Sequence, residues 1–120
     1  MSSKRRKWKF RLRHIIEAID RISGYIWGMN FEQFKVDTKT VDAVIRNFLI
    51  IGEAARHVPS EVERAHPQTP WGRMRAMSNI LVHEYESIDL KIVWNTAKDD
   101  LPLIVPLLRA VLESEDYPED

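Results

Sequence analysis

The chain has no cysteine among its 120 residues, which excludes disulfide bonds and thiolate metal sites. A chain without cysteine suits a reducing compartment. It also has no apolar run that approaches the roughly 20 residues needed to cross a bilayer, and its basic start lacks the apolar region of a signal peptide. We therefore expect a soluble, cytoplasmic protein that does not associate with membranes.

The chain also lacks net charge, although its charges are unevenly placed. It has 18 Lys and Arg residues and 18 Asp and Glu residues. The bases gather before the first acid, Glu17, and the last acids follow the last base, Arg109. A basic end can bind phosphates, but solvated tails at 1–7 and 114–120 are the simpler interpretation. The length and the 44% apolar content predict one domain, residues 1–120, with a modest core.

Apolar residues recur at helical spacing along the chain, and no stretch has a convincing strand pattern. In the last helix, Pro102 and Pro106 each remove a backbone hydrogen bond, so we expect a kink near residues 99–103. In the third, the small residues Gly52, Ala54 and Ala55 permit close approach of a neighbouring helix. The expected helices are Trp8–Trp27, Phe31–Val36 capped by Asn30, a helix from Asp37 or Thr38 to Val58-Pro59, Ser60–His66, Trp71 to about Tyr85, and a last helix that begins at Ser87 or Asp89.

The stretch from Trp71 to Asp89 contains the most informative pattern. Thr69 can cap its helix, and Pro70 suits the first helical position. Three apolar residues at positions 74, 77 and 81 make one face. A second face carries a cation, an amide and an imidazole one above the next, and a tyrosine follows near the helix end: Arg75, Asn79, His83 and Tyr85.

The segment SNILVHEY within this stretch resembles the signature of the HepT-like toxins, a branch of the HEPN ribonucleases. That signature is Arg, a polar residue that is usually Asn, three further residues, His, any residue and Tyr. Asn79, His83 and Tyr85 match it, whereas Ser78 stands where the family has Arg. The blocks TVDAVIRNFLIIGEAA, PWGRMRAM, LVHEY and IVWNTAKDDLP also resemble family blocks in family order, so the resemblance covers nearly the whole chain.

The resemblance implies an all-α fold, an antiparallel bundle of four to five helices that forms a homodimer with two motifs at one cleft. Short loops between amphipathic helices independently favour such a bundle. The implied activity is metal-independent cleavage of RNA, in which the 2′-OH attacks the phosphorus. His83 would act as base or acid, because histidine titrates near neutrality. Asn79 would orient it or bind a phosphate oxygen.

The resemblance also implies a partner. In the family, the motif tyrosine, here Tyr85, receives AMP from an MNT-type nucleotidyltransferase antitoxin, which silences the toxin of this type VII-like toxin–antitoxin pair. A bulky anionic nucleotide there would block the phosphate site. A tyrosine that only packs its ring at the helix end is the alternative interpretation.

Ser78 is the departure that matters most, because a short neutral hydroxyl cannot replace a guanidinium. A charged donor is commonly worth roughly 10²–10³ in rate. The chain is then a naturally inactive member, or it carries a selected inactivating substitution, or Arg75 supplies the charge from one turn earlier. We expect activity to be lost or reduced.

Other residues give weaker signals. Arg46 could reach the cleft, although Asp42 and Arg46 form an ordinary i, i+4 pair. His14, His57 and His66 have no motif around them. No residue set has metal-ligand spacing and there is no glycine-rich phosphate loop, so we expect neither metal nor cofactor.

Two further function classes stay open. The first is a non-catalytic helical dimer that acts as partner, or as nucleotide- or substrate-binding subunit, of a nucleotidyltransferase. The second is a helical adaptor with no link to nucleotides.

Overall fold

The computed structural model describes residues 2–79 and 87–114, and its described side chains begin at Trp8. All regular secondary structure in these residues is helical, which confirms the predicted all-α class. The elements are α1 (Ser2–Ile26), α2 (Phe31–Val36), α3 (Thr38–Ala55), α4 (Ser60–Ala65), α5 (Trp71–Ala76), the 3-10 turn η1 (Met77–Asn79), α7 (Leu90–Asn95), the π-helical turn η3 (Thr96–Asp100) and α8 (Leu101–Glu113). The first helix thus begins before the predicted start at Trp8.

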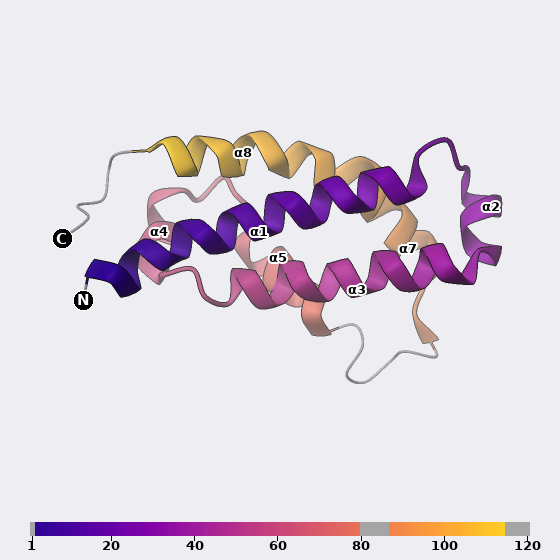
Figure 1. Ribbon diagram of the computed structural model, residues 1–120, viewed down its shortest axis with the longest axis horizontal. Coiled ribbons are helices and arrows are strands. Elements are labelled where there is room, and N and C mark those ends of the chain that lie inside the picture. Colours follow the sequence, from indigo (N-terminus) through magenta and orange to yellow (C-terminus); the bar gives the residue numbers. More distant parts are fainter. Residues whose placement is uncertain (1, 80–86, 115–120) are drawn as a thin grey trace.

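The two longest helices, α1 and α3, lie antiparallel and side by side along the length of the molecule (Figure 1). The short helix α2 lies at the end where the chain turns from α1 into α3. The helix α8 packs on α1 and runs antiparallel to it, while α5 and η1 pack on α3. The helices therefore form the expected antiparallel bundle, and α5 and η1 lie along α3.

The apolar stripes read from the sequence form the core between these helices. Their fully buried members include Leu12, Ile15, Ile19 and Ile22 of α1, Val44 and Ile51 of α3, and Leu101 and Leu108 of α8. One polar link crosses this interface. Buried Asn47 accepts a hydrogen bond from Arg21 Nε at 2.9 Å and donates one to the carbonyl oxygen of Ala43 at 2.9 Å. The amide is satisfied, which burial requires.

Side-chain caps set the starts of two helices as predicted. Asn30 caps α2 in a reciprocal capping box with Gln33, and Asp37 caps α3 by accepting from the amide of Thr40 at 3.1 Å. Phe34 is fully buried with its ring centroid 5.2 Å from that of Trp94, so this aromatic pair fills part of the core.

The last helix is interrupted near residues 99–103, where its prolines led us to expect a kink. The π-helical turn Thr96–Asp100 separates α7 from α8, and Pro102 follows at the start of α8. Proline lacks an N–H and its ring clashes with the carbonyl four residues earlier, and a π-turn is one way a helix accommodates such a defect. Pro106 lies inside α8 without ending it.

Two local expectations around residue 71 are wrong. Thr69 does not cap α5: Pro70 occupies the capping position, and the Thr69 hydroxyl is buried with no hydrogen-bond partner among the described residues. The helix expected to run unbroken from Trp71 to about Tyr85 is interrupted, because α5 ends at Ala76 and Met77–Asn79 form a 3-10 turn; residues 80–86 lie outside the described part of the chain. The described helices include none with the length and apolarity that a membrane crossing needs.

Candidate functional site

Gly52 of α3 lets the backbone at Ser78 approach the helix. A methyl group built on Gly52 would lie 2.4 Å from the nitrogen of Ser78 and 2.5 Å from its Cβ. No real side chain tolerates these distances, so only glycine fits at this position. The prediction that Gly52 permits a close approach is confirmed, and the contact fixes Ser78 against α3.

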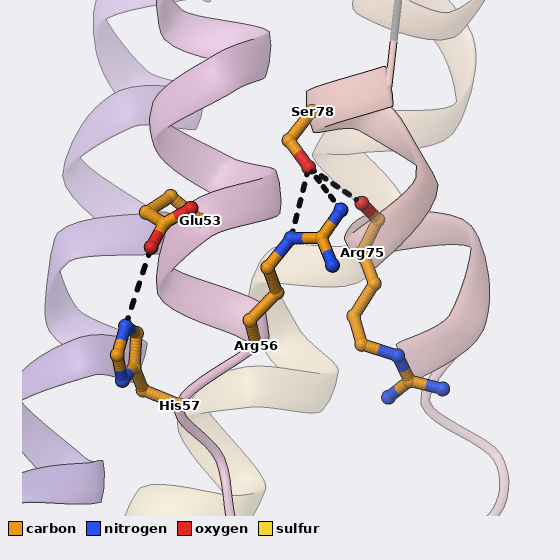
Figure 2. Close-up of polar contacts among 5 residues, drawn as sticks. All are labelled: Glu53, Arg56, His57, Arg75 and Ser78. Atoms are coloured by element: carbon orange, nitrogen blue, oxygen red, sulfur yellow. Dashed lines mark hydrogen bonds and ion pairs between the residues drawn. The ribbon is translucent and has the colours of Figure 1, made fainter.

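Arg56, one turn beyond Gly52, holds both described members of the motif. Its Nε and Nη2 donate to the Ser78 hydroxyl at 3.1 and 2.8 Å, and Nη2 also donates to Oδ1 of Asn79 at 3.0 Å. The Ser78 hydroxyl in turn donates to the carbonyl oxygen of Arg75 at 3.0 Å. A guanidinium from α3 therefore lies directly beside position 78, and Figure 2 shows it reaching across from its helix to the serine.

Arg75 points elsewhere. Figure 2 shows its guanidinium directed away from Ser78, with only its backbone oxygen turned toward the serine. Its Nη1 forms an ion pair with Glu63 of α4, and the side chain of Glu63 is only 20% exposed. The charge of Arg75 is thus neutralised by a partly buried acid.

The prediction that Arg75, Asn79 and His83 share one face depends on a continuous α-helix. The 3-10 turn at 77–79 has about three residues per turn in place of 3.6, so Asn79 is rotated relative to Arg75. His83 and Tyr85 lie outside the described residues. Asn79 is exposed and borders a depression of about 350 Å³ whose other walls include Ala76 and Ile92.

Arg46 is exposed on α3, ten residues before Arg56. The helical rise of about 1.5 Å per residue separates the two by roughly 15 Å along the axis. Arg46 therefore does not share the Ser78 contact, and its suggested substrate role stays a prediction.

Three histidines outside the motif have ordinary surroundings. His57 lies 3.3 Å from Glu53 in an i, i+4 pair, and the ring of His14 stacks at 4.1 Å from that of Phe10. The carbonyl oxygen of buried His66 accepts from the indole of Trp71 at 2.9 Å. Within residues 2–79 and 87–114, no three metal-binding side chains gather closely enough to hold an ion.

Arg56 is the residue that sequence reasoning missed. A signal was present, because Gly52 and Arg56 are four apart and so share one face of α3. The glycine marks the face on which a neighbour approaches, and the arginine extends from that face. The site that results is an exposed guanidinium bound to two neutral groups, a hydroxyl and an amide, with no carboxylate contact among the described residues. Such a group retains its full charge for an anion.

Comparisons with known proteins agree on one family. Residues 15–111 match the model of the family described as Ribonuclease HepT-like. A protein of Thermococcus cleftensis named "Probable ribonuclease HepT" is 41% identical over 98 residues, which cover 82% of this chain and 89% of its own length. A candidate RNase of Caldanaerobacter subterraneus is 30% identical over 104 residues, which cover 87% of this chain and 93% of the relative. A candidate RNase of Methanocaldococcus jannaschii is 33% identical over 106 residues, which cover 85% of this chain and 87% of the relative. No solved structure gives a significant match.

Proposed function

The chain belongs to the HepT-like family, and on that basis we propose that it is a metal-independent endoribonuclease with activity reduced by Ser78. Support comes from relatives whose names include ribonuclease, and from an exposed motif surface. Half-buried Ser78 and exposed Asn79 both accept hydrogen bonds from the Arg56 guanidinium, which contacts no carboxylate among the described residues, and Asn79 borders an open depression. A polyanion has access to such a surface.

The reaction that fits these residue types uses the RNA's own 2′-OH as nucleophile. His83 removes the 2′ proton or delivers a proton to the leaving 5′-oxygen, and either role suits an imidazole. Asn79 offers amide hydrogens to a phosphate oxygen, since its Oδ1 already accepts from Arg56. The O2′–P bond forms as the P–O5′ bond breaks, which leaves a cyclic phosphate and a free 5′-hydroxyl.

The single observation that carries the proposed reduction in rate is the neutral side chain at position 78. A guanidinium added there would stabilise the pentacoordinate phosphorus, worth roughly 10²–10³ in rate. We therefore expect Ser78→Arg to cleave single-stranded RNA roughly a hundredfold faster than the natural chain. The matched control is Ser78→Arg combined with His83→Ala, which should remove the gain. Equal rates for the natural chain and Ser78→Arg would contradict the proposed role of position 78.

We further propose that the chain is the toxin of a type VII-like toxin–antitoxin pair. It acts as a homodimer, and an MNT-type nucleotidyltransferase silences it by attaching AMP to Tyr85. The test is intact-mass analysis after incubation with a cognate MNT-type nucleotidyltransferase and ATP. One added AMP that is absent from Tyr85→Phe is the expected result. No addition, or an addition that survives Tyr85→Phe, would contradict the modification.

A second candidate function follows from the same serine. A helical dimer that binds a nucleotidyltransferase without cleaving RNA would also tolerate a neutral residue at position 78. This candidate predicts tight binding to the transferase, together with an absence of cleavage that Ser78→Arg does not restore. Cleavage by Ser78→Arg separates the two candidates.

A further inference from the structure

We infer that Arg56, the C-cap residue of α3, is the phosphate-binding cation of this site, in place of the arginine that position 78 lacks. This inference rests on the proposed function, because it assigns one residue of the same RNA-binding surface. The juxtaposition that carries it is the Arg56 guanidinium within 2.8 Å of the Ser78 hydroxyl and 3.0 Å of the Asn79 amide oxygen.

The position of the guanidinium is fixed at both ends. Arg56 follows directly after α3, whose last residue is Ala55, and Gly52 holds the Ser78 backbone against the same helix. Three hydrogen bonds then orient the planar head of Arg56. They use Nε and Nη2, so both hydrogens on Nη1 have no partner among residues 2–79 and 87–114. The Nη1 amino group, held in place by the other three bonds, can therefore donate to a phosphate oxygen.

Among residues 8–79 and 87–114, no carboxylate contacts the Arg56 guanidinium. Glu53 lies 3.3 Å from His57, and Glu63 pairs with Arg75. The two groups that Arg56 contacts are neutral acceptors. A cation held by neutral acceptors attracts an anion more strongly than one already paired with a carboxylate.

Ser78 and Arg56 also form a complementary pair. The serine hydroxyl accepts both hydrogen bonds from the guanidinium. An arginine at position 78 would place a carbon where this oxygen accepts and would set two like charges side by side. In this chain the guanidinium beside position 78 comes from Arg56, the residue that follows α3.

The test is the affinity for a short single-stranded RNA with 2′-O-methyl groups, which cannot be cleaved, measured over a range of salt concentrations. We expect Arg56→Gln to weaken binding about tenfold or more. The slope of log affinity against log salt should fall by about 0.7, the value for one phosphate contact on a single strand. The matched control is Arg109→Gln, an exposed arginine on α8, which should leave both values unchanged.

Two further variants separate phosphate binding from a structural role. Arg56→Lys keeps the charge without the fork, so it should retain the salt slope and lose part of the affinity. In the Ser78→Arg background, Arg56→Gln should weaken binding far less, because the new guanidinium takes the phosphate. If Arg56 had only a structural role, the Arg56→Gln variant would have a lower unfolding free energy and an unchanged salt slope. That result would overturn the inference.

The outcomes also distinguish this inference from the proposed function. If Ser78→Arg cleaves unmodified RNA but Arg56→Gln binds like the natural chain, only the assignment of Arg56 is overturned. If neither the natural chain nor Ser78→Arg binds or cleaves RNA, the proposed function fails and Arg56 loses its role with it.

Discussion

Arg56 and Arg75 both contact the Ser78 hydroxyl, Arg56 through its guanidinium and Arg75 through its carbonyl oxygen, yet their guanidinium groups differ in the charge of their partners. Arg75 pairs with Glu63, whose side chain is only 20% exposed, whereas Arg56 contacts a hydroxyl and an amide. The first arginine joins α5 to α4 and has its charge neutralised. The second keeps its charge at the surface. Two arginines near one motif can thus serve opposite purposes, and their partners decide which one is available to a phosphate.

The largest effect on stability is expected at the glycine that brings Ser78 to Arg56. Gly52→Ala would place a methyl group 2.4 Å from the Ser78 nitrogen, so η1 must move away from α3. We expect a loss of about 1–3 kcal/mol in the unfolding free energy, measured by denaturant titration. Because the clash is with backbone, Ser78→Gly should not relieve it.

The matched control for this substitution is Gly24→Ala. Gly24 lies in α1 and has nothing within 4 Å of the added methyl group. Alanine there should stabilise the chain by about 0.5–1 kcal/mol, because glycine is a poor helix former. Equal effects of the two substitutions would contradict the close approach.

An intermediate effect is expected at the ion pair of Arg75 and Glu63. A double-mutant cycle with Arg75→Met and Glu63→Gln should give a coupling of about 1 kcal/mol, since one partner is shielded from solvent. The exposed pair of Arg73 and Asp100, at 3.2 Å, should give roughly half that or less. A smaller coupling for the first pair would mean that Arg75 is free to bind an anion.

The smallest effect on stability is expected at Arg56. Its side chain is exposed and its partners can bond water instead, so Arg56→Gln should change the unfolding free energy by no more than about 0.5 kcal/mol. A thermal melt of this variant measures it. A loss of several kcal/mol in the unfolding free energy would show that Arg56 holds η1 to α3 and would contradict its assignment to phosphate binding.

The bundle was predictable because its elements are defined by local patterns. The spacing of Ile15, Ile19 and Ile22 marks the buried face of α1, and the caps at Asn30 and Asp37 mark helix starts. These signals act within one turn of chain. The interruption before Pro102 was predictable for the same reason, since the missing N–H is a local defect.

The site was only partly predictable because its key contacts join distant parts of the chain. Ser78 and Asn79 came from the motif, but their partner Arg56 lies 22 and 23 residues earlier. The expected ladder from Arg75 to Asn79 assumed α geometry that ends at Ala76. Thr69 failed as a cap because Pro70 took the position before α5. Helical periodicity cannot reveal which helix a glycine allows to approach.

The most direct test of the contrast between the two arginines is a nitrogen–proton NMR titration of the arginine Nε–H groups, with the 2′-O-methyl RNA as ligand. Arg56→Lys and Arg75→Lys assign the two signals. The account predicts that the Arg56 signal shifts in proportion to bound RNA while the Arg75 signal stays in place. A shift of the Arg75 signal with an unchanged Arg56 signal would contradict it.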